Sequence, residues 1–465
     1  MRKAEWGWKK AKFIFTALVI TTVYAGTAAP VLAEESIQDL KATIEALKQT
    51  VLQLEKKMIS LEKCQVVMEK CQLQDSETLA KLSKQQEEDS LKLQSMSDSE
   101  EGDDSGLMYV LKDMEMQAYG YAKLDALWSD VTGAGDIDLW VPGIPVGAAS
   151  DESASDFRMH AKQSRFGLKT STPTAWGKLN TVLEMDFYGQ GGNQNMSNSS
   201  TLRVRKAYGE LGNLRAGQDW STFLLFTAFP ETVDFAGPTG AVFDRQPLVR
   251  WTQPFEGGSW QIALENPEST FSSLDEAAPG SGNGEYMPDI VARVNLDTGF
   301  GNYAVAGLVR QLIVDSGVYD DESWVAGVTL SGSFSTFGKD TLGFNLNYGN
   351  GLGRYMMLGY KDAYINPETN KIETFDQFSG YINYRHFWME NLRSTICYSY
   401  GGADNDTQYS GDFANDNLQS MHANLIWSPI PRVNFGVEYI WASREQEDGQ
   451  DGDLNRFQTG FQYIF

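Results

Sequence analysis

Apolar and polar side chains alternate along most of the chain from Gln117 onward. The alternation is clearest at the carboxyl end, where Phe457, Phe461, Tyr463 and Phe465 share one parity. Successive side chains of a β-strand point to opposite faces, so these aromatic residues would lie together on one face. The pattern therefore predicts β-strands that each have one apolar and one polar face.

Sixteen segments carry this alternation, separated by stretches rich in Gly, Pro, Asn and Asp. The predicted strands are 117–128, 158–170, 176–188, 201–211, 213–220, 246–253, 259–266, 289–297, 302–313, 322–333, 340–349, 376–387, 392–401, 416–427, 432–443 and 454–465. Their connections alternate between short and long, and both this alternation and an even strand number are typical of bacterial outer-membrane barrels. We therefore predict an all-β transmembrane barrel of about 16 antiparallel strands over residues 117–465, around a water-filled channel.

A different periodicity precedes the strands. Apolar residues spaced alternately three and four apart form the heptad pattern of a coiled coil. They are Ile37, Leu40, Ile44, Leu47, Val51, Leu54, Met58 and Leu61. We assign residues 34–97 to an N-terminal α-helical coiled coil, with a lone amphipathic helix as the alternative. The acidic run Asp98–Gly106 contains two glycines and marks a linker over residues 98–116.

The first 33 residues have the layout of a secretory signal peptide. A lysine-rich start precedes the apolar run Phe13–Gly26, and Val31–Ala33 supplies small residues for cleavage. An uncleaved anchor is the alternative. An aromatic terminal strand on a secreted chain resembles the signal by which outer-membrane barrels are recognised for insertion. Together these features predict the outer membrane of a Gram-negative bacterium, with the coiled coil in the periplasm.

Charge and cysteine content narrow the possible partners. The formal net charge of −24 argues against nucleic-acid binding. The acidic runs in the predicted loops have two interpretations: they keep the chain soluble, or they bind lipopolysaccharide through bridging divalent cations. Outer-membrane lipid is the other partner that a barrel predicts. Cys64, Cys71 and Cys397 do not form a disulfide framework, and we treat them as structural or incidental.

No catalytic or metal-binding pattern stands out. His160, His386 and His422 lie on different predicted strands without metal-ligand spacing, and no serine or aspartate pairs with them in sequence. We therefore predict no enzymatic activity, no cofactor and no metal site. A barrel lipase or protease is the weaker alternative, to be tested for activity in purified protein.

Arginines on the predicted strands are the most conspicuous chemical feature. They are Arg165, Arg203, Arg205, Arg250, Arg293 and Arg310, each next to apolar residues of the opposite parity. An arginine that faced lipid near the membrane midplane would cost about 2–4 kcal/mol, so the pattern directs them inward. We predict that they line the pore and attract anions. Salt bridges within the barrel wall are the alternative for each of them.

One long loop, 221–245, is unusually apolar at its start, where Phe223, Leu224 and Leu225 follow one another. A simply solvated loop has no reason to be so apolar, so we predict that it folds into the lumen and narrows the pore. Its carboxylates would then face the arginines across a constriction; they are Glu231, Asp234 and Asp244. The alternative is a loop used in subunit contacts.

Several ordered blocks of the sequence resemble the DcaP-like porins. They are Ser164–Lys169, Glu184–Gly189, Leu202–Leu211, Ala216–Phe223, Pro230–Pro238 and Arg245–Trp251. The resemblance implies a homotrimer of sixteen-stranded barrels with a periplasmic coiled coil, and diffusion of small, preferably anionic solutes such as dicarboxylates. It also implies that Arg165, Arg203, Arg205 and Arg250 line the pore and that the loop from Ser221 forms the constriction.

The sequence thus predicts a trimeric porin for passive diffusion of small hydrophilic, preferably anionic solutes. A phosphate-selective porin shares the coiled coil and the barrel, but needs a ladder of Arg and Lys continued along the lumen. A structural alternative is a barrel anchor whose coiled coil acts as a spacer toward the cell wall.

Overall fold

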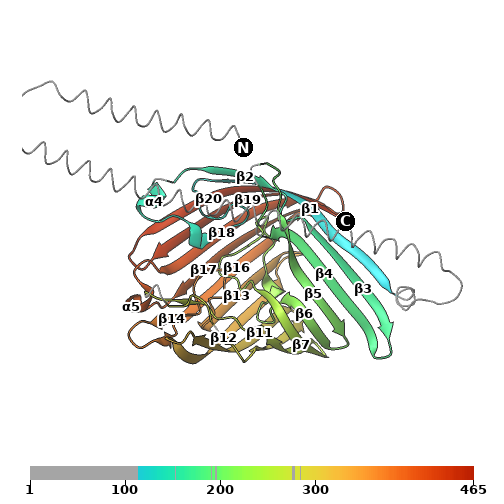
Figure 1. Ribbon diagram of the computed structural model, residues 1–465. Helices are drawn as coiled ribbons and strands as arrows, with labels where there is room; N and C mark the ends of the chain where they lie inside the picture. Colours follow the sequence, from blue (N-terminus) through green and yellow to red (C-terminus); the bar gives the residue numbers. More distant parts are fainter. Residues whose placement is uncertain (1–113, 152, 190, 194–195, 275–277, 283) are drawn as a thin grey trace, which may run out of the picture. The chain divides into compact units, whose positions relative to one another are not determined.

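The strands form one antiparallel sheet that closes into a barrel (Figure 1). This computed structural model describes residues 114–465 except 152, 190, 194–195, 275–277 and 283. The predicted signal peptide, the coiled coil and most of the linker lie outside the described residues. The described residues belong to one compact unit, Ser105–Phe465.

The strands of the barrel follow one another around the sheet in chain order. They are β1 (Glu115–Ser129), β2 (Asp156–His160), β3 (Arg165–Thr174), β4 (Gly177–Gly189), β5 (Thr201–Leu211), β6 (Leu214–Trp220), β7 (Arg245–Phe255), β8 (Gly258–Glu265), β10 (Asp289–Thr298), β11 (Gly301–Asp315), β12 (Asp320–Ser335), β13 (Thr341–Asn350), β16 (Asp376–Met389), β17 (Leu392–Ala403), β18 (Asn415–Trp427), β19 (Val433–Gln446) and β20 (Asp451–Ile464). Strand β1 pairs with β20 on one side and with β2 and β3 on the other, so the sheet closes.

Strands β2 and β3 are two parts of one interrupted strand. Both pair with β1, β2 opposite its carboxyl-terminal end and β3 opposite its beginning. At the break, the Ser164 hydroxyl replaces a strand partner by accepting a hydrogen bond of 3.0 Å from the backbone N–H of Lys123. The structure is therefore a closed barrel of sixteen strands, which confirms the predicted architecture.

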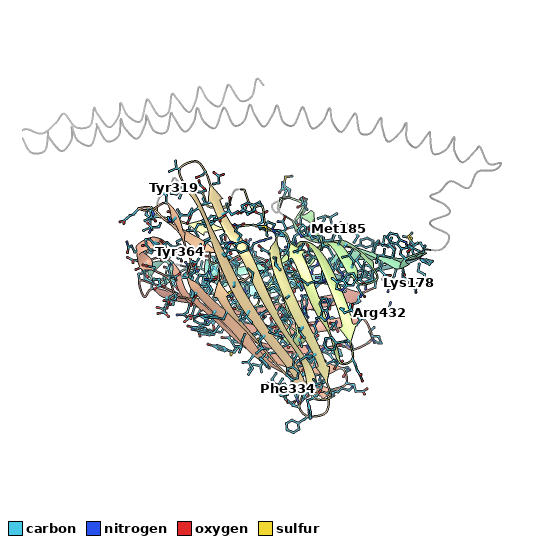
Figure 2. All side chains as sticks on the ribbon, turned by 90° about the horizontal axis from the view of Figure 1, so that it is seen from below. Lys178, Met185, Tyr319, Phe334, Tyr364 and Arg432 are labelled. Atoms are coloured by element: carbon cyan, nitrogen blue, oxygen red, sulfur yellow. The ribbon has the colours of Figure 1, made fainter. Side chains whose placement is uncertain are left out.

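The two faces of the barrel wall have opposite chemistry. On β4, Leu183 and Phe187 are exposed on the outer surface, whereas Glu184 and Asp186 are buried inside. This arrangement reverses that of a water-soluble protein and suits a wall between lipid and a polar lumen. Figure 2 shows side chains along the whole wall, with Tyr319 and Phe334 near the two ends of β12.

The long loops carry secondary structure of their own. A second sheet joins β9 (Phe271–Ser272), β14 (Ala363–Asn366) and β15 (Lys371–Glu373), and the alternating pattern did not predict it. The described helices are short: η1 (Val141–Gly143), α4 (Ala148–Asp151), η2 (Phe226–Ala228) and α5 (Thr407–Ser410). None of the helices in the described part of the chain has the length and apolar character needed to cross a bilayer.

The segment 221–244 between β6 and β7, called the inner loop below, lies inside the barrel. Its residues Phe223 and Leu225 are fully buried and belong to a cluster of apolar side chains from the barrel wall and the other long loops. The ring of Phe223 packs edge-on against Tyr355, with centroids 5.7 Å apart. The apolar core of the molecule therefore surrounds this loop.

Candidate functional site

A β-bulge in β5 gathers basic side chains inside the barrel. Met185 pairs with Val204 and Glu184 pairs with Lys206, so Arg205 is an additional residue on β5. Beyond the bulge the parity of β5 reverses, and Lys206 turns inward, where its Nζ lies 4.0 Å from Asp219. Strict alternation along this strand would have pointed Lys206 toward lipid. The free-energy cost of a lysine in lipid was the one sequence signal that argued for an inward position.

Carboxylates of β4 bind the arginines of β5. Arg203 makes a bidentate pair with Asp186, through Nε at 3.0 Å and Nη2 at 2.8 Å. Arg205 bridges Glu184 and Asp186, with 2.8 Å to each carboxylate. Arg205 is only 2% exposed, whereas the side chain of Arg203 is 34% exposed and reaches the lumen. Arg165 lies 3.7 Å from Glu184.

A second group of ion pairs continues the wall on β6 and β7. Arg215 and Arg250 share Asp219, at 2.6 Å and 2.9 Å. Glu210 holds Arg215 from the neighbouring strand at 2.5 Å. These pairs fit the alternative interpretation of salt bridges within the wall, because most guanidinium groups here have a carboxylate partner.

Arg245 differs from the other arginines of this wall. Its guanidinium lies over the ring of Trp220, 4.7 Å from the centroid, and its Nη1 is buried without a hydrogen-bond partner. The guanidinium of Arg245 forms no ion pair within 4.0 Å among the described residues, because the neighbouring carboxylate of Asp244 accepts from the Arg245 backbone N–H instead. Arg245 ends the predicted loop 221–245, so the alternating pattern of the strands gave no prediction for the direction of its side chain.

Basic side chains therefore outnumber carboxylates on this side of the lumen, which we call the cationic wall. The cations are Arg165, Arg203, Arg205, Lys206, Arg215, Arg245 and Arg250. The carboxylates within 4.0 Å of them are Glu184, Asp186, Glu210 and Asp219. The wall therefore carries an excess of positive charge.

Arg293 and Arg310, also predicted to line the pore, lie elsewhere. Arg293 donates from Nη1 to the backbone carbonyl of Leu224 at 3.0 Å, so it supports the inner loop. Arg310 is 0% exposed and binds Asp362 at 2.9 Å and Asp289 at 3.3 Å. The long loops fold over Arg310 and bury it, so it has no surface on the channel, which differs from the expectation.

Glu265 on β8 fixes the beginning of the inner loop. Its carboxylate accepts hydrogen bonds from the Ser221 hydroxyl and the Thr222 backbone N–H, each at 2.7 Å. Gln246 on β7 donates to the same carboxylate at 2.6 Å. The loop thus leaves the cationic wall at a well-defined point.

The rest of the inner loop binds the opposite wall, formed by β13 and β16–β19 and called the docking wall below. Glu438 accepts hydrogen bonds from the backbone N–H groups of Val233 at 2.9 Å and Asp234 at 3.0 Å. Side chains of the docking wall also bind loop backbone groups: Asn383 binds Ala228 O, Asn424 binds Glu231 O, Asn347 binds Gly240 O and Ser399 binds Gly240 N. The loop therefore spans the lumen.

Two glycines make room for the tip of the loop. Gly436 on β19 pairs with Gly460 on β20, and both lie on the inner face. A Cβ atom at Gly436 would lie 2.6 Å from Val233 Cγ2, and one at Gly460 would lie 2.9 Å from Val233 Cγ1. Any larger residue would collide with the loop, so this glycine pair sets how closely the tip approaches the wall.

The three loop carboxylates predicted to face the arginines bind other partners. Glu231 forms a bidentate pair with Arg393 on the docking wall, at 2.6 Å and 2.7 Å. Asp234 accepts hydrogen bonds from backbone N–H groups, including that of Leu139 at 3.0 Å. Asp244 lies 3.9 Å from Arg354. Glu231 and Asp234 thus bind partners outside the cationic wall, and Asp244 reaches only the backbone N–H of Arg245 on that wall, which corrects the expected transverse arrangement.

Burial changes the protonation of acidic groups in two of the loops. It raises the pKa of Asp234 and of Asp244. Burial, reinforced by the nearby charge of Asp234, raises the pKa of Asp138 to about 7. Asp138 also interacts electrostatically with Arg203, so its charge at neutral pH is felt at the cationic wall.

Within the described part of the chain, no group of three or more His, Cys, Asp or Glu side chains is arranged to hold a metal ion. The polar groups inside the barrel are instead used in ion pairs and in hydrogen bonds to the loop backbone. Most of these groups therefore hold the loop and the wall in place.

The closed barrel with a loop across its lumen has the architecture of an outer-membrane channel. The chain belongs to the DcaP outer membrane protein family, which matches residues 46–465. The crystal structure of the outer membrane channel DcaP of Acinetobacter baumannii is 24% identical, with a TM-score of 0.67 over 76% of this chain and 98% of that chain. OmpT of Vibrio cholerae is 11% identical, with a TM-score of 0.50 over 76% and 98%. No curated protein sequence matches the chain.

Proposed function

We propose that this outer-membrane protein is a homotrimeric porin for passive diffusion of small hydrophilic solutes, with a preference for anions such as dicarboxylates. The observation that carries the proposal is the excess of basic side chains on the cationic wall, where Arg245 has no carboxylate partner. Family membership supports a channel, and the heptads at residues 37–61 support an oligomer.

The inner loop defines the constriction in this proposal. It leaves the cationic wall at Glu265 and reaches the docking wall at Glu438, so solutes must pass between the loop and the arginines. Arg203 and Arg245 would contact a passing anion, because neither is fully buried. A narrow, weakly solvated space strengthens the attraction between an anion and these groups.

The test is the reversal potential of the protein in a planar bilayer under a KCl gradient. Wild type should be anion-selective. The variant Arg165→Ala/Arg203→Ala/Arg205→Ala removes three cations but retains Glu184 and Asp186, so the chloride-to-potassium permeability ratio should fall by about tenfold or more.

Three results would count against the proposal. Cation selectivity of wild type would mean that the acidic loops control permeation. An unchanged ratio in the triple variant would place the selectivity elsewhere in the lumen. Absence of any conductance in correctly inserted barrels would favour the structural anchor.

A further inference from the structure

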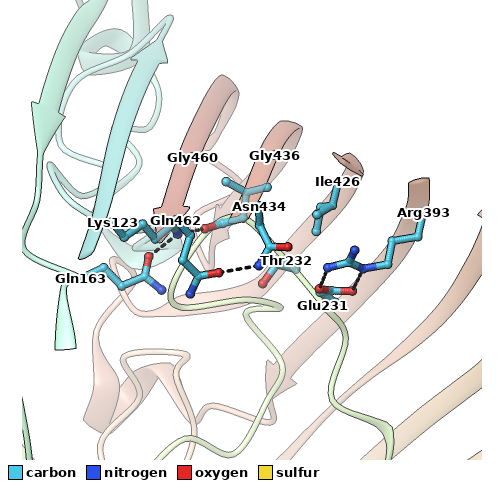
Figure 3. Close-up of a pocket in the computed structure, with 11 residues that line it drawn as sticks. Lys123, Gln163, Glu231, Thr232, Arg393, Ile426, Asn434, Gly436, Gly460 and Gln462 are labelled. Carbon is cyan, nitrogen blue, oxygen red and sulfur yellow. Dashed lines mark hydrogen bonds and ion pairs between the residues drawn. The ribbon is translucent and has the colours of Figure 1, made fainter. Parts of the chain in front are cut away.

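A small polar cavity lies beneath the tip of the inner loop, away from the cationic wall (Figure 3). Its volume is ≈ 100 Å³, and the loop tip encloses it together with residues from β1, β17, β18, β19 and β20. None of the basic residues of the cationic wall lines it. Arg393, Asn434 and Gln462 lie close to the short turns of their strands, so the cavity is at the short-turn end of the lumen.

Lys123 fixes the orientation of one amide in this cavity. Its ammonium group can only donate hydrogen bonds, and it donates to Gln163 Oε1 and, at 2.7 Å, to the Val233 carbonyl. The amide oxygen of Gln163 must therefore face Lys123, and its Nε2 points away. That nitrogen donates no hydrogen bond to any described residue, and Figure 3 shows it directed into the cavity.

A chain of hydrogen bonds fixes the second amide in the same sense. Arg393, which can only donate, binds the Ser428 hydroxyl at 2.9 Å, and this hydroxyl donates to Asn434 Oδ1 at 2.7 Å. The nitrogen of Asn434 then donates to Gln462 Oε1 at 3.0 Å. The Nε2 group of Gln462 is thereby left as a donor without an acceptor in the described structure.

The carboxylate that lines the cavity is already used. Both oxygens of Glu231 bind Arg393, and Asp125 lies 3.0 Å from Lys123. Arg385 adds a further positive charge 3.7 Å from Glu231. Among the residues that line the cavity, two cations, Lys123 and Arg393, therefore accompany one carboxylate, Glu231, and the two free amide groups offer N–H donors. Such a site favours a ligand group that is negatively charged and only accepts hydrogen bonds.

We propose that this cavity is a second binding site for a carboxylate group of the permeating solute, on the short-turn side of the inner loop. The inference rests on the proposed function as an anion-conducting porin. An anion that has passed the arginines would be held by Gln163 Nε2 and Gln462 Nε2, in the field of Lys123 and Arg393. Two weak stations in series allow a solute to enter and leave a channel without being trapped at one of them.

The test uses the full chain in planar bilayers and succinate as the probe, added separately to each side of the membrane. The quantity measured is the duration of succinate-induced current blockades. In Gln163→Ala/Gln462→Ala, loss of two hydrogen bonds to a charged group should shorten the blockades by about 100-fold or more. Gln261→Ala is the matched control, because Gln261 also faces inward but lies on β8, outside the cavity.

The isosteric variant Gln462→Glu tests the same site in case the double variant does not fold. It keeps the side-chain shape and replaces the free donor by a carboxylate oxygen, so the blockades should shorten at least as much. Proper folding of each variant is checked by its heat-modifiable mobility in gel electrophoresis.

The outcomes separate the two proposals. Blockades of wild-type duration in both cavity variants, or no blockade of wild type by succinate, would overturn the second site. Shortened blockades together with unchanged anion selectivity in KCl would support it. If the cavity variants shorten the blockades but the wild-type protein shows no anion selectivity in KCl, the second site is retained and the selectivity part of the proposed function is rejected.

Discussion

The cationic wall and the docking wall face each other across one lumen, yet they are built from different residues. The cationic wall consists of six arginines and one lysine held by four carboxylates, and the side chain of Arg203 remains 34% exposed. The docking wall presents mainly asparagines and serines, such as Asn347, which is 3% exposed and binds a loop carbonyl. In the proposed function, charge selection and loop positioning therefore belong to opposite sides of the barrel.

The side chains of each wall suit what that wall contacts. The docking wall meets loop backbone, whose buried N–H and C=O groups each need a partner. Neutral amides and hydroxyls supply most of these partners, and Glu438, which also contacts His422 and Asn424, supplies the acceptor for two loop N–H groups. The cationic wall meets water and solute, so its charges keep part of their solvation and can attract a passing ion.

The largest effect is expected from detaching the loop at Glu438. In Glu438→Ala, two loop N–H groups and Asn424 Nδ2 lose their acceptor, which weakens docking by about 3 kcal/mol. Cys397 is buried against Ala228 and Ala241 of the loop, so its reaction with a methanethiosulfonate reports detachment. A Cys64→Ser/Cys71→Ser background leaves Cys397 as the sole thiol. Fast labelling is expected in the variant and none in its parent.

A matched control for this variant is Glu322→Ala, which removes a carboxylate from β12 that binds Tyr286 and Gln311, not the inner loop. Cys397 should remain unreactive in this control. If Cys397 also stays unreactive in Glu438→Ala, the loop does not depend on Glu438, and the division between the two walls fails.

A smaller effect is expected from filling the glycine pair under the loop tip. The Cβ of Gly436→Ala would lie 2.6 Å from Val233 Cγ2, and such overpacking typically costs about 1–3 kcal/mol. The tip should move off the docking wall and the single-channel conductance should change. Gly209→Ala is the control, because a Cβ there meets nothing within 4 Å. If Gly436→Ala and Gly209→Ala have the same conductance, the added methyl group does not displace the loop tip and the prediction is wrong.

The smallest effect is a dependence of selectivity on pH. Burial raises the pKa of Asp138 to about 7, so this carboxyl is mostly ionised at pH 8 and mostly protonated at pH 6. Protonation removes a negative charge that acts on Arg203, so anion selectivity should rise as the pH falls through 7. The reversal potential at pH 8 and pH 6 measures the change. Asp138→Asn should be more anion-selective at pH 8 and should lose most of the dependence.

The sequence was sufficient to predict the sixteen strands, because an alternating pattern and alternating connection lengths depend on local residues alone. The apolar residues at the start of the inner loop also indicated burial. The pattern could not reveal the β5 bulge that turns Lys206 inward, since a bulge changes parity within an otherwise regular strand. It also could not reveal the loop sheet of β9, β14 and β15, which pairs segments far apart in the chain.

The sequence predicted which arginines face inward, but not which of them are exposed to the lumen. Inward parity is a local property, and Arg203 and Arg205 do face the lumen side of β5. Whether an arginine is exposed depends on what folds over it. The loops bury Arg310 completely, while Arg245 remains without a carboxylate beside the inner loop. Tertiary contacts alone decide such differences.

The central claim is that unpaired positive charge on the cationic wall sets anion preference. The most direct measurement compares reversal potentials under a KCl gradient for Arg245→Gln and Arg158→Gln. Arg158 is an exposed arginine on β2 that pairs with Asp156 and lies outside this wall. We predict that Arg245→Gln lowers the chloride-to-potassium permeability ratio by about two- to fivefold, while Arg158→Gln leaves it unchanged. Equal ratios in wild type and both variants would contradict the claim.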